Sequence, residues 1–173
     1  MGIGIALLSL FLASPPPEAP EQAYRFKILD IIYRTETIGG RVEDFQVRES
    51  AIDIRLELNA DVLFEFDKAE LLPDAEPVLQ KAAAYLEQET KSAIRIEGHT
   101  DSKGDEAYNM RLSLQRAEAV RRWLRERGGI DPSRMSASGL GEKNPVTPNS
   151  RPDGSDDPEG RRRNRRVEIV IRK

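Results

Sequence analysis

Apolar and polar residues alternate without interruption over residues 52–58. In an extended chain this places the apolar residues on one face and the charged residues on the other, which predicts a half-buried β-strand. Residues 94–96 predict a second, short strand that ends at Gly98, and the alternation over 167–172 predicts a closing strand. The apolar face of the first strand consists of Ile52, Ile54, Leu56 and Leu58.

Two other stretches repeat their apolar residues at helical spacing. The first follows Pro73; Asp74 is suited to cap it, and Pro77 is tolerated in a first turn, where its N–H would be unpaired in any case. The second runs from about 105 to 127 and stops at Gly128-Gly129, because glycine readily adopts the left-handed conformation that ends helices. The predicted buried stripe of the first helix is Ala75, Val78, Leu79, Ala82, Ala83 and Leu86.

The remaining segments complete the predicted fold. Residues 135–138 predict a brief strand, and the prolines and glycines of 141–164 predict a long mobile loop. The order strand, helix, strand, helix, strand, strand predicts an α/β (α+β) domain in which helices pack on a mixed sheet. The crossovers should make the first strand pairs parallel, which gives a β-α-β-α-β-β sandwich.

The N-terminal third has a different character. The apolar run of residues 3–13 has the length of a signal-peptide core and is too short to span about 30 Å of hydrocarbon comfortably. We therefore interpret 1–14 as a signal peptide or a short N-terminal anchor. Residues 15–50 are predicted to be a proline-rich spacer and an attachment segment that is either a helix or a strand, and 51–173 a single globular domain.

Composition narrows the function classes. The chain has 173 residues, no cysteine and a formal net charge of -3. Disulfides, thiolate metal sites, cysteine nucleophiles and lipidation of an N-terminal cysteine are therefore excluded. The arginines of 161–166 favour polyanion binding in isolation, but the preceding acidic residues offset their charge, so no nucleic acid is expected.

One charged residue lies where the pattern predicts burial. On a helical wheel Arg116 falls inside the apolar arc of the second helix, and Asn109 points the same way. A buried charge without a partner costs roughly 3–5 kcal/mol. Arg116 therefore needs a nearby protein carboxylate or an anionic ligand. The apolar arc comprises Leu112, Ser113, Ala117, Val120, Trp123 and Leu124.

Asp101 is the obvious carboxylate, since it follows the second predicted strand and precedes this helix. A carboxylate and a guanidinium side by side suit a zwitterion, because one accepts an ammonium group while the other binds a carboxylate. A simpler alternative is that Asp101 and Arg116 pair with each other and tie the loop to the helix. Glu97, His99 and Asp101 also alternate along the strand end, but they offer no nucleophile and come from one element, so neither an enzyme nor a metal site is predicted.

Several motifs resemble one family. The segments 100–104, 108–109, 112–113 and 116–117 resemble the peptidoglycan-binding signature of OmpA-like and MotB-like domains, and segments 62–71, 139–142 and 164–168 resemble the flanking parts of that family. The resemblance covers roughly the last two-thirds of the chain. Residues 155–159 depart from the family pattern, because they lengthen the loop before Gly160.

The resemblance implies non-covalent binding of peptidoglycan in the periplasm, in association with the outer membrane, without catalysis or cofactor. It assigns the amino group of diaminopimelate to Asp101 and its carboxylate to Arg116. Thr100, Asn109 and Leu112 would line or support the groove, as would Asp67, each with a purely structural role as an equal alternative.

Partners and alternatives follow from the same resemblance. The N-terminal segment is expected to contact the membrane or envelope proteins. In a homo-oligomer, several weak contacts with peptidoglycan would act together and give firm attachment. An envelope assembly or adhesion module with a protein partner is the main alternative. A flagellar-type stator relative is disfavoured, because the leader lacks both the length and the intramembrane carboxylate.

Overall fold

The computed structural model describes residues 45–89 and 92–173. The predicted leader (1–14) and most of the predicted spacer (15–50) lie outside the described residues, so those assignments stay predictions. In the part of the chain that the structure describes, no helix combines the length and the apolar character that a membrane crossing requires.

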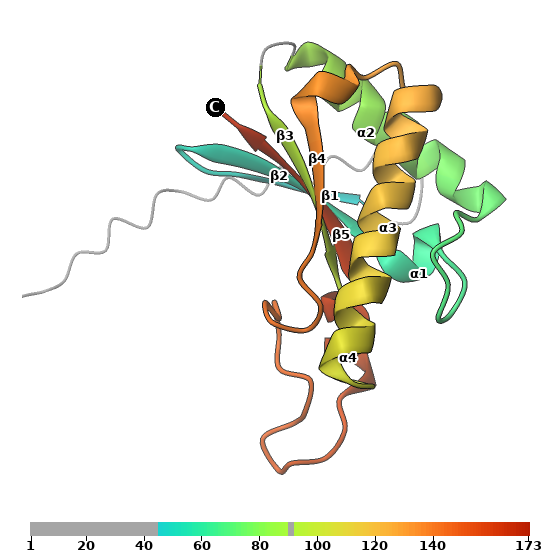
Figure 1. Ribbon diagram of the computed structural model, residues 1–173. Helices are drawn as coiled ribbons and strands as arrows, with labels where there is room; N and C mark the ends of the chain where they lie inside the picture. The colour runs from blue at the N-terminus through green and yellow to red at the C-terminus, as the bar shows by residue number, and fades with distance from the viewer. Residues whose placement is uncertain (1–44, 90–91) are drawn as a thin grey trace, which may run out of the picture.

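Within residues 45–89 and 92–173, five strands form one mixed sheet in the order β1-β2-β5-β3-β4 (Figure 1). β3 and β4 are parallel, whereas β5 lies between β2 and β3 and is antiparallel to both. The predicted mixed sheet is confirmed. Parallel pairing of the first two predicted strands is wrong, because β5 separates them. The strands are β1 (Phe45–Glu49), β2 (Asp53–Asn59), β3 (Ile94–His99), β4 (Met135–Gly139) and β5 (Arg166–Arg172).

The structure makes two sequence predictions about β1 and the start of β2 more specific. The end of the attachment segment is a strand, β1, which pairs antiparallel with β2. Ile54, Leu56 and Leu58 are buried as predicted, but Ile52 is 75% exposed. Ile52 lies in a bend before β2 begins, where the alternation of strand faces does not yet apply.

Helices α2 (Glu76–Gln88) and α3 (Glu106–Glu126) lie on one side of the sheet (Figure 1). The whole predicted stripe of the first helix is buried, and so is the predicted arc of the second. Asp74 does not cap α2, because a 3₁₀ turn (Pro73–Ala75) precedes that helix and neither start has a side-chain cap. Asp105 caps α3, and Gly129 follows that helix with φ +69°.

Two glycines bring α3 unusually close to the sheet. A Cβ on Gly98 of β3 would lie 1.9 Å from the Ser113 carbonyl oxygen, and one on Gly139 of β4 would lie 2.5 Å from the Leu114 nitrogen. Only glycine permits this approach. As a result, the loop that follows β3 lies directly against the first turns of α3.

The predicted long loop ends in regular structure. Residues Pro158–Asn164 form helix α4, with Pro158 in the first turn and Asp157 accepting a hydrogen bond from the Gly160 nitrogen. The Asn164 side chain, 0% exposed, binds the backbone of Val146 and Thr147. The loop is thus tied to α4 through hydrogen bonds to the buried Asn164 side chain. The remaining short elements are α1 (Ala60–Leu63) and a 3₁₀ turn over Pro132–Arg134.

Candidate functional site

Asp101 lies just beyond the end of β3, and its side chain is largely buried. Its Oδ1 accepts a hydrogen bond from the Lys103 backbone N–H at 3.0 Å, which closes a tight Asx turn. Its Oδ2 lies 2.8 Å from Nη1 of Arg165 and 3.7 Å from Nε of Arg161. Both oxygens are therefore oriented by the protein itself.

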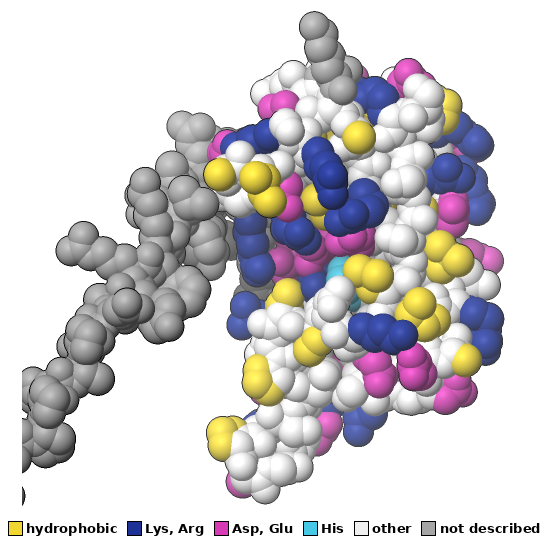
Figure 2. Space-filling model, turned by 60° about the vertical axis from the view of Figure 1, so that its left-hand side comes forward, with side chains coloured by type: hydrophobic (Ala, Val, Ile, Leu, Met, Phe, Trp, Pro, Cys, Tyr) yellow, Lys and Arg dark blue, Asp and Glu magenta, His cyan; other side chains and the backbone are white. Residues whose placement is uncertain are grey.

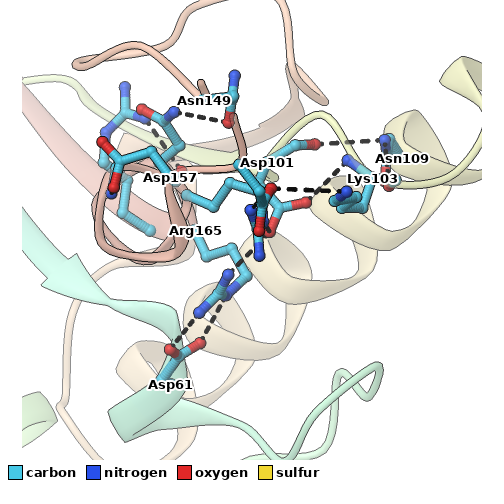
Figure 3. Close-up of polar contacts among 12 residues, drawn as sticks. Asp61, Asp101, Lys103, Asn109, Asn149, Asp157 and Arg165 are labelled. Atoms are coloured by element: carbon cyan, nitrogen blue, oxygen red, sulfur yellow. Dashed lines mark hydrogen bonds and ion pairs between the residues drawn. The ribbon is translucent and has the colours of Figure 1, made fainter. Parts of the chain in front are cut away.

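Arg165 was not predicted as a site residue. It follows α4, and its guanidinium makes two hydrogen bonds with Asp61, at 2.9 Å from Nε and 2.6 Å from Nη2. Figure 3 shows Arg165 lying between Asp61 and Asp101. Hydrogen bonding to Asp61 raises the pKa of Arg165 further above its ordinary value, so this side chain remains a cation. The four-residue spacing of Arg161 and Arg165 would place both on one face of a helix, but it does not indicate Asp101 or Asp61 as their partners.

Arg116 is buried on α3, with 4% of its surface exposed. Its Nε donates to the Lys68 carbonyl oxygen at 2.9 Å, and its guanidinium carbon lies 5.2 Å from the centre of the Phe64 ring. Among the described residues, no carboxylate forms an ion pair with Arg116. The simpler alternative, direct pairing of Asp101 with Arg116, is therefore not the arrangement observed.

The electrostatic surroundings of Arg116 link it to the same cluster. Burial lowers the pKa of its guanidinium from the ordinary value, and the negative charges of Asp61 and Asp67 oppose that shift. The positive charge of Arg165 acts in the same direction as burial. Arg116 thus lies within electrostatic range of the residues that orient Asp101.

Asp67 and Tyr108 form one edge of this cluster. Asp67 is exposed in the loop after α1 and adopts φ +62°, an uncommon conformation for a residue other than glycine. Its Oδ1 accepts a hydrogen bond from the Tyr108 hydroxyl at 2.7 Å. That bond holds the loop carrying Asp67 against the first turn of α3.

The other three predicted residues occupy supporting positions. Asn109 is 2% exposed and donates to the Lys103 carbonyl oxygen at 3.0 Å and to Glu142 at 2.9 Å, so it braces the loop that carries Asp101. Thr100 is buried and donates its backbone N–H to the Gly141 carbonyl oxygen. Leu112 is 8% exposed and lies outside the main apolar core cluster.

The face of the sheet opposite α2 and α3 carries a second charged cluster. Glu97, His99 and Glu168 are buried, with ligand-type atoms within 4.8 Å of one another, and Figure 2 shows basic and acidic side chains gathered around the histidine. Asp101 does not join them, since it turns toward Arg165. The neighbouring arginines are Arg55, at 2.9 Å from Glu168, Arg166, at 2.7 Å from Glu168, and Arg95, at 2.5 Å from Glu97.

These arginines decide how the cluster is interpreted. Guanidinium groups already compensate the charge of both carboxylates, and a divalent cation would add positive charge beside them. We therefore interpret Glu97 and Glu168 as part of an ion-paired network with these arginines, and His99 as a neutral side chain buried beside it.

Comparison with curated proteins identifies relatives from several bacteria. The chain is 41% identical over 137 residues to photosystem I P700 chlorophyll a apoprotein A2 of Gloeobacter violaceus, covering 79% of this chain and 16% of that protein. It is 43% identical over 113 residues to outer membrane protein A of Bordetella avium, covering 65% and 55%. It is 31% identical to the outer-membrane lipoprotein YfiB of Pseudomonas aeruginosa, covering 98% and 92%. The chain thus spans about half or less of the first two relatives.

Solved structures confirm the fold. The cell wall anchor of the T6SS from Pseudomonas aeruginosa matches with a TM-score of 0.64 and 30% identity, covering 74% of this chain and 87% of that one. The peptidoglycan-associated lipoprotein from Burkholderia pseudomallei matches with a TM-score of 0.54 and 34% identity, covering 64% and 87%. Both similarities support a domain of helices on a mixed sheet.

The family and the cellular location follow from these comparisons. The named outer membrane protein and outer-membrane lipoprotein confirm the predicted periplasmic, outer-membrane-associated location. The family model described as OmpA family matches residues 63–159, which include α2, α3 and the Asp101 loop. The chain therefore belongs to the OmpA family.

Proposed function

We propose that this domain binds peptidoglycan non-covalently, through the free amino group and carboxylate of diaminopimelate in the peptide stem. Asp101 accepts the ammonium group, and Arg116 binds the carboxylate. The proposal includes no catalytic step, because recognition of a zwitterion requires only two opposite charges at a fixed separation.

The observation that carries this proposal is the state of Arg116. The guanidinium is buried, yet among the described contacts it donates to the protein through Nε alone, and among the described residues no carboxylate pairs with it. A ligand carboxylate would supply the compensating charge that such a cation needs. Asp101 lies in the neighbouring loop with its carboxylate already oriented.

Two similar structures support the same choice of ligand. One is described as a cell wall anchor and the other as a peptidoglycan-associated lipoprotein. Within this proposal Asp67 and Tyr108 form one wall of the site, Asn109 and Thr100 support the Asp101 loop, and Leu112 contributes an apolar surface. The N-terminal segment would link the domain to the membrane or to an envelope complex.

Co-sedimentation of the full chain with purified sacculi tests the proposal. Asp101→Asn and Arg116→Gln each remove one charge at nearly constant size. Each should lower the binding constant about tenfold or more, since a hydrogen bond to a charged group contributes roughly 1.5–3 kcal/mol. Asp74→Asn and Arg122→Gln remove the same charges at exposed positions and should change nothing. Folded Asp101→Asn and Arg116→Gln proteins that pelleted like the parent would refute the assignment.

A further inference from the structure

The arginines of residues 161–166 have different ion-pair partners in the fold. Arg162 pairs with Glu159, and Arg166 pairs with Glu168 on the sheet face. Arg161 and Arg165, one helical turn apart, instead face Asp101. The part of the run that faces the site therefore consists of these two residues.

The Arg165 side chain is oriented by contacts other than its hydrogen bond to Asp101. Its carbonyl oxygen accepts the Ala60 backbone N–H at 3.0 Å, and its Nε and Nη2 hold both oxygens of the Asp61 carboxylate. This two-point arrangement fixes the plane of the guanidinium. Nη1 is then left to donate to Asp101 Oδ2 at 2.8 Å, as Figure 3 shows.

Asp101 is consequently fixed at both oxygens, by the Lys103 N–H on one side and by Arg165 on the other. A carboxylate offers about four acceptor positions, so these two bonds leave room for an ammonium group. A side chain that is already ordered loses less conformational entropy when it binds a ligand. The charge of Arg165 is also shared with Asp61, which limits its competition with that ammonium.

We propose that Arg165, held by Asp61, is a positioning residue that orients Asp101 and so determines selectivity for a free amino group in the ligand. This inference rests on the proposed function and deepens it. Arg165 acts through Asp101, whereas Arg116 binds the ligand carboxylate without its help. Loss of Arg165 therefore weakens recognition of the amino group specifically.

The test measures that selectivity with two soluble probes by calorimetry. The first probe is N-acetylmuramyl-L-alanyl-γ-D-glutamyl-meso-diaminopimelate, in which the only free amine is that of diaminopimelate. The second is the same molecule with that amine acetylated. The full-length parent should bind the amine form about tenfold or more tightly than the acetylated form, as expected for a charged hydrogen bond.

Arg165→Gln should reduce this ratio at least threefold, mainly by weakening the amine form. Asp61→Asn, which touches Arg165 and not Asp101 in the described contacts, should reduce the ratio in the same direction and serves if Arg165→Gln does not fold. Arg163→Gln removes the same charge from an exposed position of α4 and should leave the ratio unchanged. Thermal unfolding of every variant separates selectivity from stability.

The outcomes distinguish this inference from the proposed function. A parent that discriminates between the probes, together with folded Arg165→Gln and Asp61→Asn proteins that keep the parental ratio, would overturn the role of Arg165 alone. Tighter binding of the amine form by Arg165→Gln would show that Arg165 competes with the ligand, and would also overturn it. A parent that binds neither probe would overturn both proposals.

Discussion

His99 is the one histidine of the chain, and it is 2% exposed at the end of β3. Neither ring nitrogen has a hydrogen-bond partner within the described residues. Burial, together with the positive charge of Arg166, lowers the pKa of His99 to about 4, although Glu168 opposes the shift. The imidazole is therefore neutral at neutral pH, and its 4.0 Å approach to Glu168 is not an ion pair.

This residue predicts how stability depends on pH. The unfolded chain takes up a proton at His99 near pH 6.5 and the folded chain only near pH 4. Between these values the unfolded state binds more protons, so stability falls as the pH falls. The loss should reach about 2–3 kcal/mol. Urea unfolding of the parent and of His99→Gln between pH 4 and 7.5 measures it, and an equally steep profile in His99→Gln would contradict the assignment.

At the scale of elements, the contact of α3 with β3 and β4 sets the site geometry. Arg116 and Asn109 come from the helix, while Asp101 comes from the loop after β3. Their relative placement depends on how closely the helix lies on the strands. Gly98 and Gly139 permit that approach, and the Ser113 hydroxyl adds a 3.0 Å hydrogen bond from the Gly141 nitrogen.

Substitution Gly98→Ala should destabilise the domain by about 3 kcal/mol, the upper part of the range for overpacked sites. The added methyl would meet the Ser113 backbone at 1.9 Å, and a backbone carbonyl cannot rotate away as a flexible side chain can. Chemical denaturation provides the measurement. Gly154→Asn is the control, because nothing lies within 4 Å of its Cβ position; asparagine adopts positive φ more readily than most residues, so the backbone strain at φ +82° should cost less than the clash at Gly98. Equal effects of the two substitutions would argue against close packing at Gly98.

At the scale of the whole molecule, β5 joins two halves that otherwise do not pair. It lies between the β1-β2 hairpin and the parallel β3-β4 pair, and all its contacts with them are distant in sequence. It also carries four buried apolar side chains into the sheet: Val167, Ile169, Val170 and Ile171. Each such side chain contributes roughly 1.5–3 kcal/mol on burial, so together they approach the total stability of a typical domain.

A chain that ends at residue 163 should therefore show no cooperative unfolding transition by circular dichroism. Adding a synthetic peptide of residues 160–173 should restore the transition, whereas the same peptide with Ile169→Asp should not, because that change places a charge in the core. A cooperative transition in the truncated chain alone would show that the two halves assemble without β5.

Local sequence patterns are enough to identify most of the buried faces of the helices and strands. The helical period placed Arg116 and Asn109 among apolar residues, and the alternation of strands placed Asp101 just past a strand end; the structure has all three there. These properties follow from local geometry, since the periods of helix and strand depend only on neighbouring residues. The prediction of a loop over 141–164 was wrong at residues 158–164, which form α4. Proline is compatible with the first turn of a helix, so Pro158 does not prevent a helix from starting there.

The partners of the charged side chains, by contrast, follow from the folded arrangement of the chain. Arg165 lies 64 positions from Asp101 and 104 from Asp61 in the chain, and no local pattern relates them. The insertion of β5 between β2 and β3 brings the end of α4 beside both carboxylates. Which charged side chains pair depends on their distance and orientation in the folded chain. Local sequence patterns do not give these quantities, so the ion pairs of Asp101 could be identified only from the fold.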